Sequence, residues 1–486
     1  MQVEESEEPD ESPEHRGVPA PQTDYDLIVV GSGSAAFSAA IRATDLGATV
    51  ALCEADTVGG TCVNIGCVPS KAMLAAADLY HRAAHSPYAG IETGAGAVDL
   101  AALVAAKDEL VDTMRYDKYE HLAEDYGFTL LSGRGEFVDG DGFRCDGREL
   151  RAEQYLIATG AAPAVPPIPG LHEAGYLTST TALEVEELPA SLVVIGANAI
   201  GLEMGQLFLH LGSQVTFLEA VDQVAPFEEP EISAAFADLL RDQGARIHTG
   251  TQVTRVDRIR DRRIVVFSTR EGEQRIDCDH VLVATGRRPN TSGLGLDRIG
   301  VEVDERGAVR VDEFQGTSHP RVWAAGDVTG APQFVYVAAA QGAIAADNAI
   351  GKAGRTMDTK ALPRVTFTSP QIASAGMTER EALDAGLSVE SRVLRLDAVP
   401  RALVNRDTRG LFKIVADREG GRVRGIHLLA DNAGDVIAAA VYAIKKDMTI
   451  AEMSDTWSPY LTMAEGLKLT AQTFTRDVTR LSCCAA

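Results

Sequence analysis

The chain has 486 residues, enough for about three domains that each bury a core. Its hydrophobic content of 45% and charged content of 24% are typical of a globular enzyme, and its net charge of −25 disfavours nucleic acid or an anionic membrane as a partner. No apolar run reaches the ~18 residues of a membrane span, and no secretory signal is visible. The seven cysteines lack the spacing of a disulfide framework, which favours a reducing, cytoplasmic location.

The first 23 residues carry seven carboxylates among several prolines, a composition typical of a disordered acidic tail. A strand is then predicted over 26–30, followed by a glycine-rich turn, a helix to about residue 46, and a second strand that ends at Glu54. Gly31 and Gly33 would let a pyrophosphate approach the helix N-terminus, and the small Ala36 would let this helix pack on the strand. Glu54, 23 residues after Gly31, is placed to accept a hydrogen bond from a ribose.

The same order of elements recurs over 191–219, where Gly196 and Gly201 belong to the turn and helix and Glu219 ends the second strand. Asn198 replaces the second glycine, and asparagine is the non-glycine residue that best tolerates unusual backbone angles. Two short strands that end in Ala-Thr-Gly, at 158–160 and 284–286, accompany the two units. Two dinucleotide units in one chain imply electron transfer between two dinucleotides.

Cys62 and Cys67 lie between the first unit and a helix predicted over 71–77. Two cysteines five residues apart can close a small disulfide ring, whereas metal-binding knuckles more often use two C-x₂-C pairs, which the chain lacks. A position near a helix start, with Lys71 nearby, should lower the pKa of a thiol and favour the reactive thiolate. The pair is therefore predicted to be redox-active.

These motifs resemble those of the flavin-dependent pyridine nucleotide–disulfide oxidoreductases, from about Tyr25 to the end of the chain. The resemblance rests on G-S-G-S-A-A (31–36), G-G-T-C-V-N-I-G-C-V-P-S-K (59–71), the two A-T-G segments, G-A-N-A-I-G-L-E (196–203) and A-A-G-D (324–327). It implies an α/β protein with two Rossmann-like dinucleotide-binding domains and an α+β C-terminal dimerisation domain. The expected boundaries are 1–23 for the acidic tail, 24–163 and 288–358 for the FAD-binding domain, 164–287 for the NAD(P)H-binding domain, and 359–486 for the C-terminal domain.

The resemblance also implies FAD in the first unit and a nicotinamide nucleotide in the second. Cys62 and Cys67 would form the redox disulfide, with Cys67 against the flavin and Cys62 exchanging with substrate. Lys71 and Glu203 correspond to a pair near the flavin N5 and the nicotinamide. The expected cofactor-binding residues are Gly31, Gly33, Ala36, Glu54, Thr61, Lys71, Gly135, Asp327 and Val335 for FAD, and Gly196, Gly201, Glu203, Glu219 and Gly286 for the nicotinamide nucleotide.

The C-terminal region indicates which branch of the family the chain resembles. Disulfide-reducing members carry His-Pro-x-x-x-Glu, whose histidine protonates the leaving thiol. Here Tyr460 replaces that histidine while Glu465 is kept, and a tyrosine with an ordinary pKa of ~10 cannot shuttle this proton at neutral pH. The adjacent Cys483 and Cys484 could bridge only through a strained ring, yet they suit one soft metal ion.

This end of the chain, with segments 176–180 and 333–337, resembles the mercury(II)-reducing branch of the family. That resemblance implies reduction of thiol-bound Hg(II) to Hg(0) and a homodimer whose subunits share the active site. The implied catalytic residues are Cys62, Cys67, Tyr176, Tyr460, Cys483 and Cys484, and the four cysteines are also the implied metal ligands.

Two alternatives remain open at this point. One is a dihydrolipoamide- or glutathione-type disulfide reductase, against which Tyr460 argues. The other is a non-catalytic metal-sequestering protein, against which the two dinucleotide fingerprints argue. For the coenzyme, Glu219 would repel a 2′-phosphate and no arginine lies between it and Glu231, so we predict that NADH is accepted.

Overall fold

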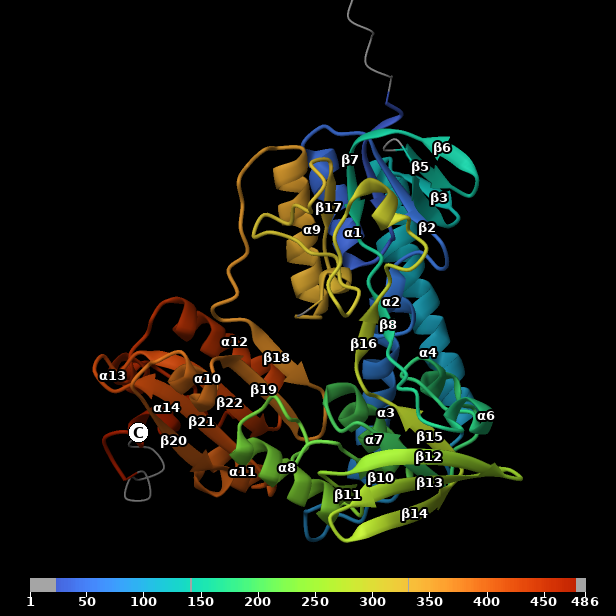
Figure 1. Ribbon diagram of the computed structural model, residues 1–486. Coiled ribbons are helices and arrows are strands. Elements are labelled where there is room, and N and C mark those ends of the chain that lie inside the picture. Colours follow the sequence, from blue (N-terminus) through green and yellow to red (C-terminus); the bar gives the residue numbers. More distant parts are fainter. Residues whose placement is uncertain (1–22, 140–141, 331, 478–486) are drawn as a thin grey trace, which may run out of the picture.

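The structure is a computed structural model that describes residues 23–139, 142–330 and 332–477. Figure 1 shows three bodies: one at the top around α1 and α9, and two side by side below, around β10 and around β22. Most of the predicted acidic tail and the Cys483–Cys484 pair lie outside the described residues. Among the helices that are described, none has both the length and the apolarity that a membrane crossing requires.

The first body is a five-stranded parallel sheet in the order β17-β7-β1-β2-β3. Residues 27–30 of β1 are all buried, as expected for a parallel strand covered on both faces. The alanine-rich helix α1 packs directly on α9, where a Cβ on Gly342 would lie 2.1 Å from the Ala35 carbonyl oxygen. The bounds are β1 Tyr25–Val30, β2 Val50–Glu54, β3 Thr129–Ser132, β7 Ala152–Ile157, β17 Val322–Ala324, α1 Ser34–Asp45 and α9 Val335–Ala349.

Helical segments and a small antiparallel sheet complete this body. The helical segments are α2 Gly60–Asn64, α3 Cys67–Ala84, α4 Leu100–Arg115, the π-helix η1 Tyr116–Glu120 and α5 His121–Tyr126. The small sheet contains β4 Gly135–Val138, β5 Gly142–Cys145 and β6 Arg148–Leu150. A disulfide joins Cys53 of β2 to Cys145 of β5. The cysteine spacing gave no sign of this bridge, because its two residues are 92 positions apart and meet only where the small antiparallel sheet packs on the parallel sheet.

The second body repeats the design with a parallel sheet in the order β11-β10-β9-β15. Its longer helices are α7 Ala199–Leu211 and α8 Pro230–Asp242, and an antiparallel sheet of three strands packs on the parallel sheet. The strands are β9 Ser191–Ile195, β10 Gln214–Leu218, β11 Arg246–His248, β15 His280–Val283, and, in the antiparallel sheet, β12 Gln252–Ile259, β13 Arg262–Thr269 and β14 Gly272–Cys278. The two-stranded ribbon of β8 Ala161–Pro163 and β16 Arg287–Pro289 connects the first two bodies (Figure 1).

The third body is an antiparallel sheet in the order β18-β19-β22-β21-β20, with helices packed against it. The strands are β18 Pro363–Thr366, β19 Gln371–Gly376, β20 Val389–Arg395, β21 Leu411–Asp417 and β22 Val423–Ala430. The helices are α10 Glu379–Asp384, α11 Pro400–Asn405, α12 Ala433–Lys445, α13 Ile450–Asp455 and α14 Glu465–Gln472. This confirms the predicted fold class, an α/β protein with an α+β C-terminal part.

Two local expectations differ from the structure. The helix predicted over 71–77 begins at Cys67 and runs to Ala84, because the apolar spacing continues beyond the alanine-rich stretch. Asn198 has φ −102° and ψ −172°, which is ordinary extended backbone, so its tolerance of unusual angles is not used. The positive φ of this turn falls on Gly196, at +99°.

Candidate functional site

Two consecutive helices bring Cys62 and Cys67 together. Cys62 lies within α2, and Cys67 is the first residue of α3, with Gly66 between the helices. A Cβ on Gly66 would lie 2.7 Å from the Thr61 carbonyl oxygen, so only glycine lets the two helices approach this closely. Both cysteines are free thiols in the structure, which therefore shows the reduced form of the predicted redox pair.

The two thiols are not equivalent electrostatically. The Cys62 S–H donates a hydrogen bond to the Cys67 sulfur, and this bond, aided by the Lys71 charge, lowers the pKa of Cys67 to about 6 although burial and Glu203 oppose the shift. The same bond, followed by burial, raises the pKa of Cys62 above its ordinary value. At neutral pH the pair is therefore a thiol on Cys62 and a thiolate on Cys67.

An ion pair beside the thiolate joins all three bodies. Lys71 Nζ on α3 lies 2.7 Å from Glu203 Oε2 on α7, and Glu203 is only 6% exposed. The other Glu203 oxygen accepts a hydrogen bond of 2.8 Å from the Phe367 backbone N–H, just after β18. The Lys71 ammonium also lies 4.8 Å from the centre of the Phe367 ring. Glu203 therefore fixes the second unit and the C-terminal body against the helix that carries Cys67.

Two adjoining cavities together extend from these thiols, which line the first, to the end of β2, which lines the second. The first is lined by the two thiols and by Glu203, which was predicted for the nicotinamide nucleotide. It is also lined by five of the residues predicted for FAD: Gly33, Thr61, Lys71, Asp327 and Val335. The second contains Gly31, Gly33, Glu54, Thr61 and Gly135. They share seven wall residues: Gly33, Thr61, Ile65, Ala158, Gly160, Ala161 and Arg287. The fingerprint residues thus form one elongated site that leads to the thiol pair.

The glycine turn fits a dinucleotide. Gly31 has φ +113°, and a Cβ there would lie 2.5 Å from the Ala158 carbonyl oxygen, so the protein itself requires this glycine. Gly33 differs, because its backbone is ordinary and a Cβ would have no neighbour closer than 3.9 Å. The packing of the protein therefore does not require a glycine at position 33. Because Gly33 lines a cavity at the N-terminus of α1, its missing side chain leaves room for a pyrophosphate. The fit supports FAD, with Ala36 fully buried where α1 packs on the sheet.

The second unit has the same geometry around its terminal acid. A Cβ on Gly196 would lie 2.5 Å from the Ala284 carbonyl oxygen, and one on Gly201 would lie 1.9 Å from the Gly196 carbonyl oxygen. Glu219 accepts backbone N–H bonds from Ala197 at 2.7 Å and from Val221 at 3.1 Å. Gly286 has φ +108° at the end of the second A-T-G segment. These residues lie at the turn of the second unit and suit the adenosine part of a nicotinamide nucleotide.

The two predicted tyrosines lie elsewhere. Within the described part of the chain, neither Tyr176 nor Tyr460 lines the two cavities. The Tyr176 ring packs on the apolar core of the second unit and meets His172 edge-on. Tyr460, between α13 and α14, is 47% exposed. Glu465 is buried nearby, where burial raises its pKa although a backbone N–H bond from Leu461 opposes the shift.

Two site residues escaped the sequence reasoning. Tyr119 lies in the π-helix η1 and packs edge-on against Phe37, and burial near the thiol pair raises the pKa of its hydroxyl. Arg287 lines both cavities, and its Nε lies 3.4 Å from Asp327, whose pKa is raised by burial and partly restored by this guanidinium. Neither residue belongs to a motif, although π-helices often occur at functional sites.

A thiol–thiolate pair beside two dinucleotide units defines a dinucleotide-dependent dithiol oxidoreductase. Two family models match the chain: pyridine nucleotide-disulphide oxidoreductase over residues 25–342, and the dimerisation domain of the same family over residues 362–471. The chain belongs to the pyridine nucleotide-disulphide oxidoreductase family, whose members typically use FAD and NAD(P)H.

Several curated relatives and solved structures resemble the chain over nearly its full length. Mercuric reductase from Streptomyces lividans is 51% identical over 469 residues, which cover 95% of this chain and 99% of that protein. Mercuric reductase from Staphylococcus aureus is 49% identical over 462 residues, covering 95% of this chain and 84% of that protein. Among solved structures, the Cu(II) complex of the HOCl-induced flavoprotein disulfide reductase RclA from Escherichia coli matches with a TM-score of 0.84 and 30% identity, covering 94% of this chain and 100% of that one.

Proposed function

We propose that this chain is an FAD-dependent mercury(II) reductase that uses NAD(P)H to reduce thiol-bound Hg(II) to Hg(0), a detoxification reaction. The observation that carries the proposal is the Cys62–Cys67 pair at the end of the elongated cavity, in a chain about half identical to proteins named mercuric reductase. We assign FAD to residues 24–163 and 288–358, the nicotinamide nucleotide to 164–287, and dimerisation to 359–486. The reaction would take place in the cytoplasm, where NAD(P)H and small thiols are available.

The residues suggest how the metal is held. Hg(II) is a soft cation that prefers two sulfur ligands, and the Cys67 thiolate is ready to bind it at neutral pH. Hg(II) arrives bound to two small-molecule thiolates. When the Cys62 sulfur replaces the second of them on the metal, Cys62 loses its proton, and the departing thiolate can take that proton up. A bound flavin would supply the two electrons that convert Hg(II) to Hg(0). Lys71 and Glu203 hold α3 in place while the charge beside Cys67 changes.

The direct test is mercury-dependent oxidation of NAD(P)H by the purified yellow holoenzyme, with Hg(0) release measured in parallel. Turnover with mercury and none with lipoamide or glutathione disulfide is the expected result. Turnover with a disulfide and none with mercury would instead support the disulfide-reductase alternative. A preparation that binds mercury but shows no bleaching of its flavin when NAD(P)H is added would indicate a sequestering protein.

We further propose a homodimer in which the tail of one subunit delivers mercury to the other. The described chain carries a dimerisation domain, and its Trp457 is 96% exposed, as expected of an aromatic residue at a subunit interface. Cys483 and Cys484 would then pass Hg(II) to the partner's thiol pair, one thiolate at a time. An isologous interface gives both subunits the same arrangement.

Mixing two inactive variants tests delivery between subunits. After subunit exchange between Cys62→Ala and the Cys483→Ala/Cys484→Ala double variant, each mixed dimer holds one intact site and one doubly broken site. Random exchange makes about half the dimers mixed, so activity should return to about a quarter of the unmodified value. Mercury must be supplied on a bulky thiol that cannot bypass the tail. No recovery after confirmed exchange would mean that each tail serves its own subunit.

A further inference from the structure

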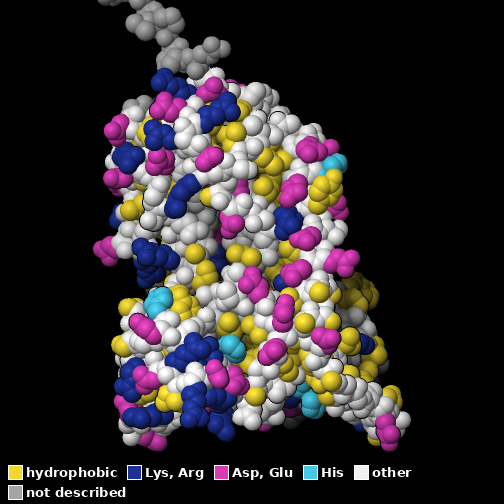
Figure 2. Space-filling model, turned by 90° about the vertical axis from the view of Figure 1, so that its right-hand side faces the viewer, with side chains coloured by type: hydrophobic (Ala, Val, Ile, Leu, Met, Phe, Trp, Pro, Cys, Tyr) yellow, Lys and Arg dark blue, Asp and Glu magenta, His cyan; other side chains and the backbone are white. Residues whose placement is uncertain are grey.

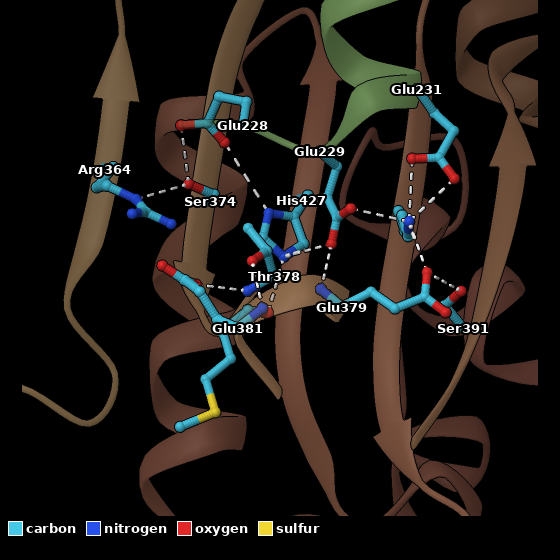
Figure 3. Close-up of polar contacts among 12 residues, drawn as sticks. Glu228, Glu229, Glu231, Arg364, Ser374, Thr378, Glu379, Glu381, Ser391 and His427 are labelled. Atoms are coloured by element: carbon cyan, nitrogen blue, oxygen red, sulfur yellow. Dashed lines mark hydrogen bonds and ion pairs between the residues drawn. The ribbon is translucent and has the colours of Figure 1, made fainter. Parts of the chain in front are cut away.

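A buried ammonium group joins the C-terminal sheet to the second dinucleotide unit (Figure 3). Lys413 on β21 is 1% exposed, and its Nζ lies 2.9 Å from Glu229, 2.9 Å from both oxygens of Glu231 and 3.0 Å from Glu379. Glu379 begins α10 of the same body, whereas Glu229 and Glu231 come from the start of α8 in the other body. Burial alone would lower the pKa of Lys413, but hydrogen bonds with the three carboxylates raise it.

Glu229 shows that this contact runs between the two bodies. It is the N-cap residue of α8, yet its side chain makes no capping bond to its own helix. Instead, Glu229 Oε1 accepts a 2.6 Å bond from the Glu379 backbone N–H, and Oε2 accepts the bond from Lys413. Glutamate is not among the residues that usually cap a helix N-terminus, so this carboxylate is available for contacts outside α8. The Glu229 carboxylate is therefore committed to the C-terminal body.

The preceding residue extends the same contact. Glu228 accepts a 3.2 Å bond from the Ser374 hydroxyl on β19, and its second oxygen lies 3.9 Å from Nδ1 of His427 on β22 (Figure 3). His427 is fully buried, and its Nε2 lies 3.0 Å from the Met377 carbonyl oxygen. Because a carbonyl oxygen only accepts, Nε2 carries the proton of this bond. Residues 228–231 thus contact the C-terminal body as one continuous segment.

The other end of this segment is Glu219, at the turn of the second unit. The loop from Glu219 to Glu229 crosses back over the glycine turn, where the Ala225 N–H donates to the Ala197 carbonyl at 2.8 Å. The Ala197 N–H donates in turn to Glu219. One short loop, 219–229, therefore runs from the expected ribose-binding carboxylate to the Lys413 ion cluster.

We propose that Lys413 is a positioning residue for the nicotinamide nucleotide: by anchoring Glu229 and Glu231, it holds loop 219–229 in the conformation that binds the adenosine ribose. The inference rests on the proposed coenzyme role of the second unit. Glu203 separately joins the two bodies beside the thiols, so loss of Lys413 should release the loop without separating the bodies. The effect should fall on coenzyme binding and leave mercury binding unchanged.

The test compares three variants of the holoenzyme. Lys413→Met leaves the buried Glu229 without its counterion. Glu231→Gln removes one negative charge from the cluster, on a side chain that is 42% exposed. Because no buried charge is left unpaired, this variant should fold even if Lys413→Met does not. Asp417→Asn is the matched control, because Asp417 pairs with Arg424 at 2.6 Å entirely within the C-terminal sheet. The readouts are the KM for NAD(P)H in flavin reduction, the KM for thiol-bound mercury, and amide hydrogen exchange of peptides covering 219–229.

Lys413→Met should raise the coenzyme KM about five- to tenfold, the range of a modest coupling between sites, with the mercury KM unchanged. Amides of loop 219–229 should exchange faster while those of α7 stay protected. Glu231→Gln should shift both readouts less and in the same direction, and Asp417→Asn should shift neither. The inference is overturned if Lys413→Met changes neither the coenzyme KM in flavin reduction nor the amide exchange of loop 219–229. If Lys413→Met does not fold, the same result in Glu231→Gln overturns it. Failure of mercury turnover with normal flavin reduction would refute the proposed substrate alone.

Discussion

Removing the hydrogen bond between the two thiols should weaken the Cys67 thiolate at neutral pH. The Cys62 S–H donates to Cys67, and this bond is the largest cause of the drop in the Cys67 pKa from 9.0 to about 6. Cys62→Ala removes the donor, whereas Cys62→Ser keeps a hydroxyl that can still donate. The two variants differ mainly in this one interaction, and in both of them Cys67 is free of its disulfide partner.

The size of the effect follows from the strength of the bond. A hydrogen bond to a charged group contributes ~1.5–3 kcal/mol, and one pKa unit corresponds to ~1.4 kcal/mol, so the shift is about one to two units. Losing a bond to the charged form raises the pKa, which places Cys67 at about 7–8 in Cys62→Ala. At pH 7 the ionised fraction should fall from about nine-tenths to between about a tenth and a half.

The assay is the rate of Cys67 alkylation by iodoacetamide as a function of pH, because only the thiolate reacts. Cys62→Ser should show a midpoint near that of the native dithiol, and Cys62→Ala one that is one to two units higher. Lys71→Met should shift the midpoint less, because the lysine charge lowers the Cys67 pKa less than the hydrogen bond from Cys62 does. Equal midpoints in the serine and alanine variants would show that the thiol–thiol bond does not control this pKa.

Three further outcomes are expected. Tyr460→Phe should slow mercury reduction and leave flavin reduction by NAD(P)H intact; unchanged mercury turnover would make this tyrosine a packing residue. Gly66→Ala should destabilise the protein by ~1–3 kcal/mol, measured as a lower midpoint of denaturation, because the new Cβ would lie 2.7 Å from the Thr61 carbonyl oxygen. Protein reduced by NAD(P)H and then denatured should show five reactive thiols, because two of the seven cysteines, Cys53 and Cys145, are bridged. Cys53→Ser should show six, and a count of seven in the native sequence would refute the bridge.

The predictable parts of this structure are those with local signals. The strand, glycine turn, helix and acid of each unit lie within about 30 residues, so their order alone located β1, α1 and β2 and their counterparts β9, α7 and β10. The Cys62–Cys67 pair was likewise readable from its position near a helix start. These signals depend on chain periodicity and turn chemistry, which act between near neighbours.

Contacts between distant segments could not be predicted in this way. β17 pairs with β7 across more than 150 residues, and Lys413 meets Glu229 across 184. The approach of Glu203 to the Phe367 backbone arises only when the second and third bodies meet. The Cys53–Cys145 bridge forms only once distant parts of the first body have packed together, and no motif marks the π-helix that contains Tyr119. Charges of both signs lie side by side on the face shown in Figure 2, and no sequence motif indicates which of them form pairs.

The coenzyme prediction gains a second test from one such distant contact. No arginine follows Glu219 in its own loop, but the turn between β13 and β14 brings Arg270 to Asp222 of that loop, at 3.1 Å. The Arg270 side chain is 85% exposed and free to turn toward a 2′-phosphate, while both Glu219 oxygens are held by backbone N–H groups. We expect NADH to be accepted, and any use of NADPH to depend on Arg270. Arg270→Ala should therefore lower kcat/KM for NADPH by about tenfold, the loss of one charge-assisted bond of ~1.5 kcal/mol, and leave the value for NADH unchanged. A large preference for NADPH that survives this substitution would show that a different cation binds the phosphate and that Glu219 does not select the coenzyme.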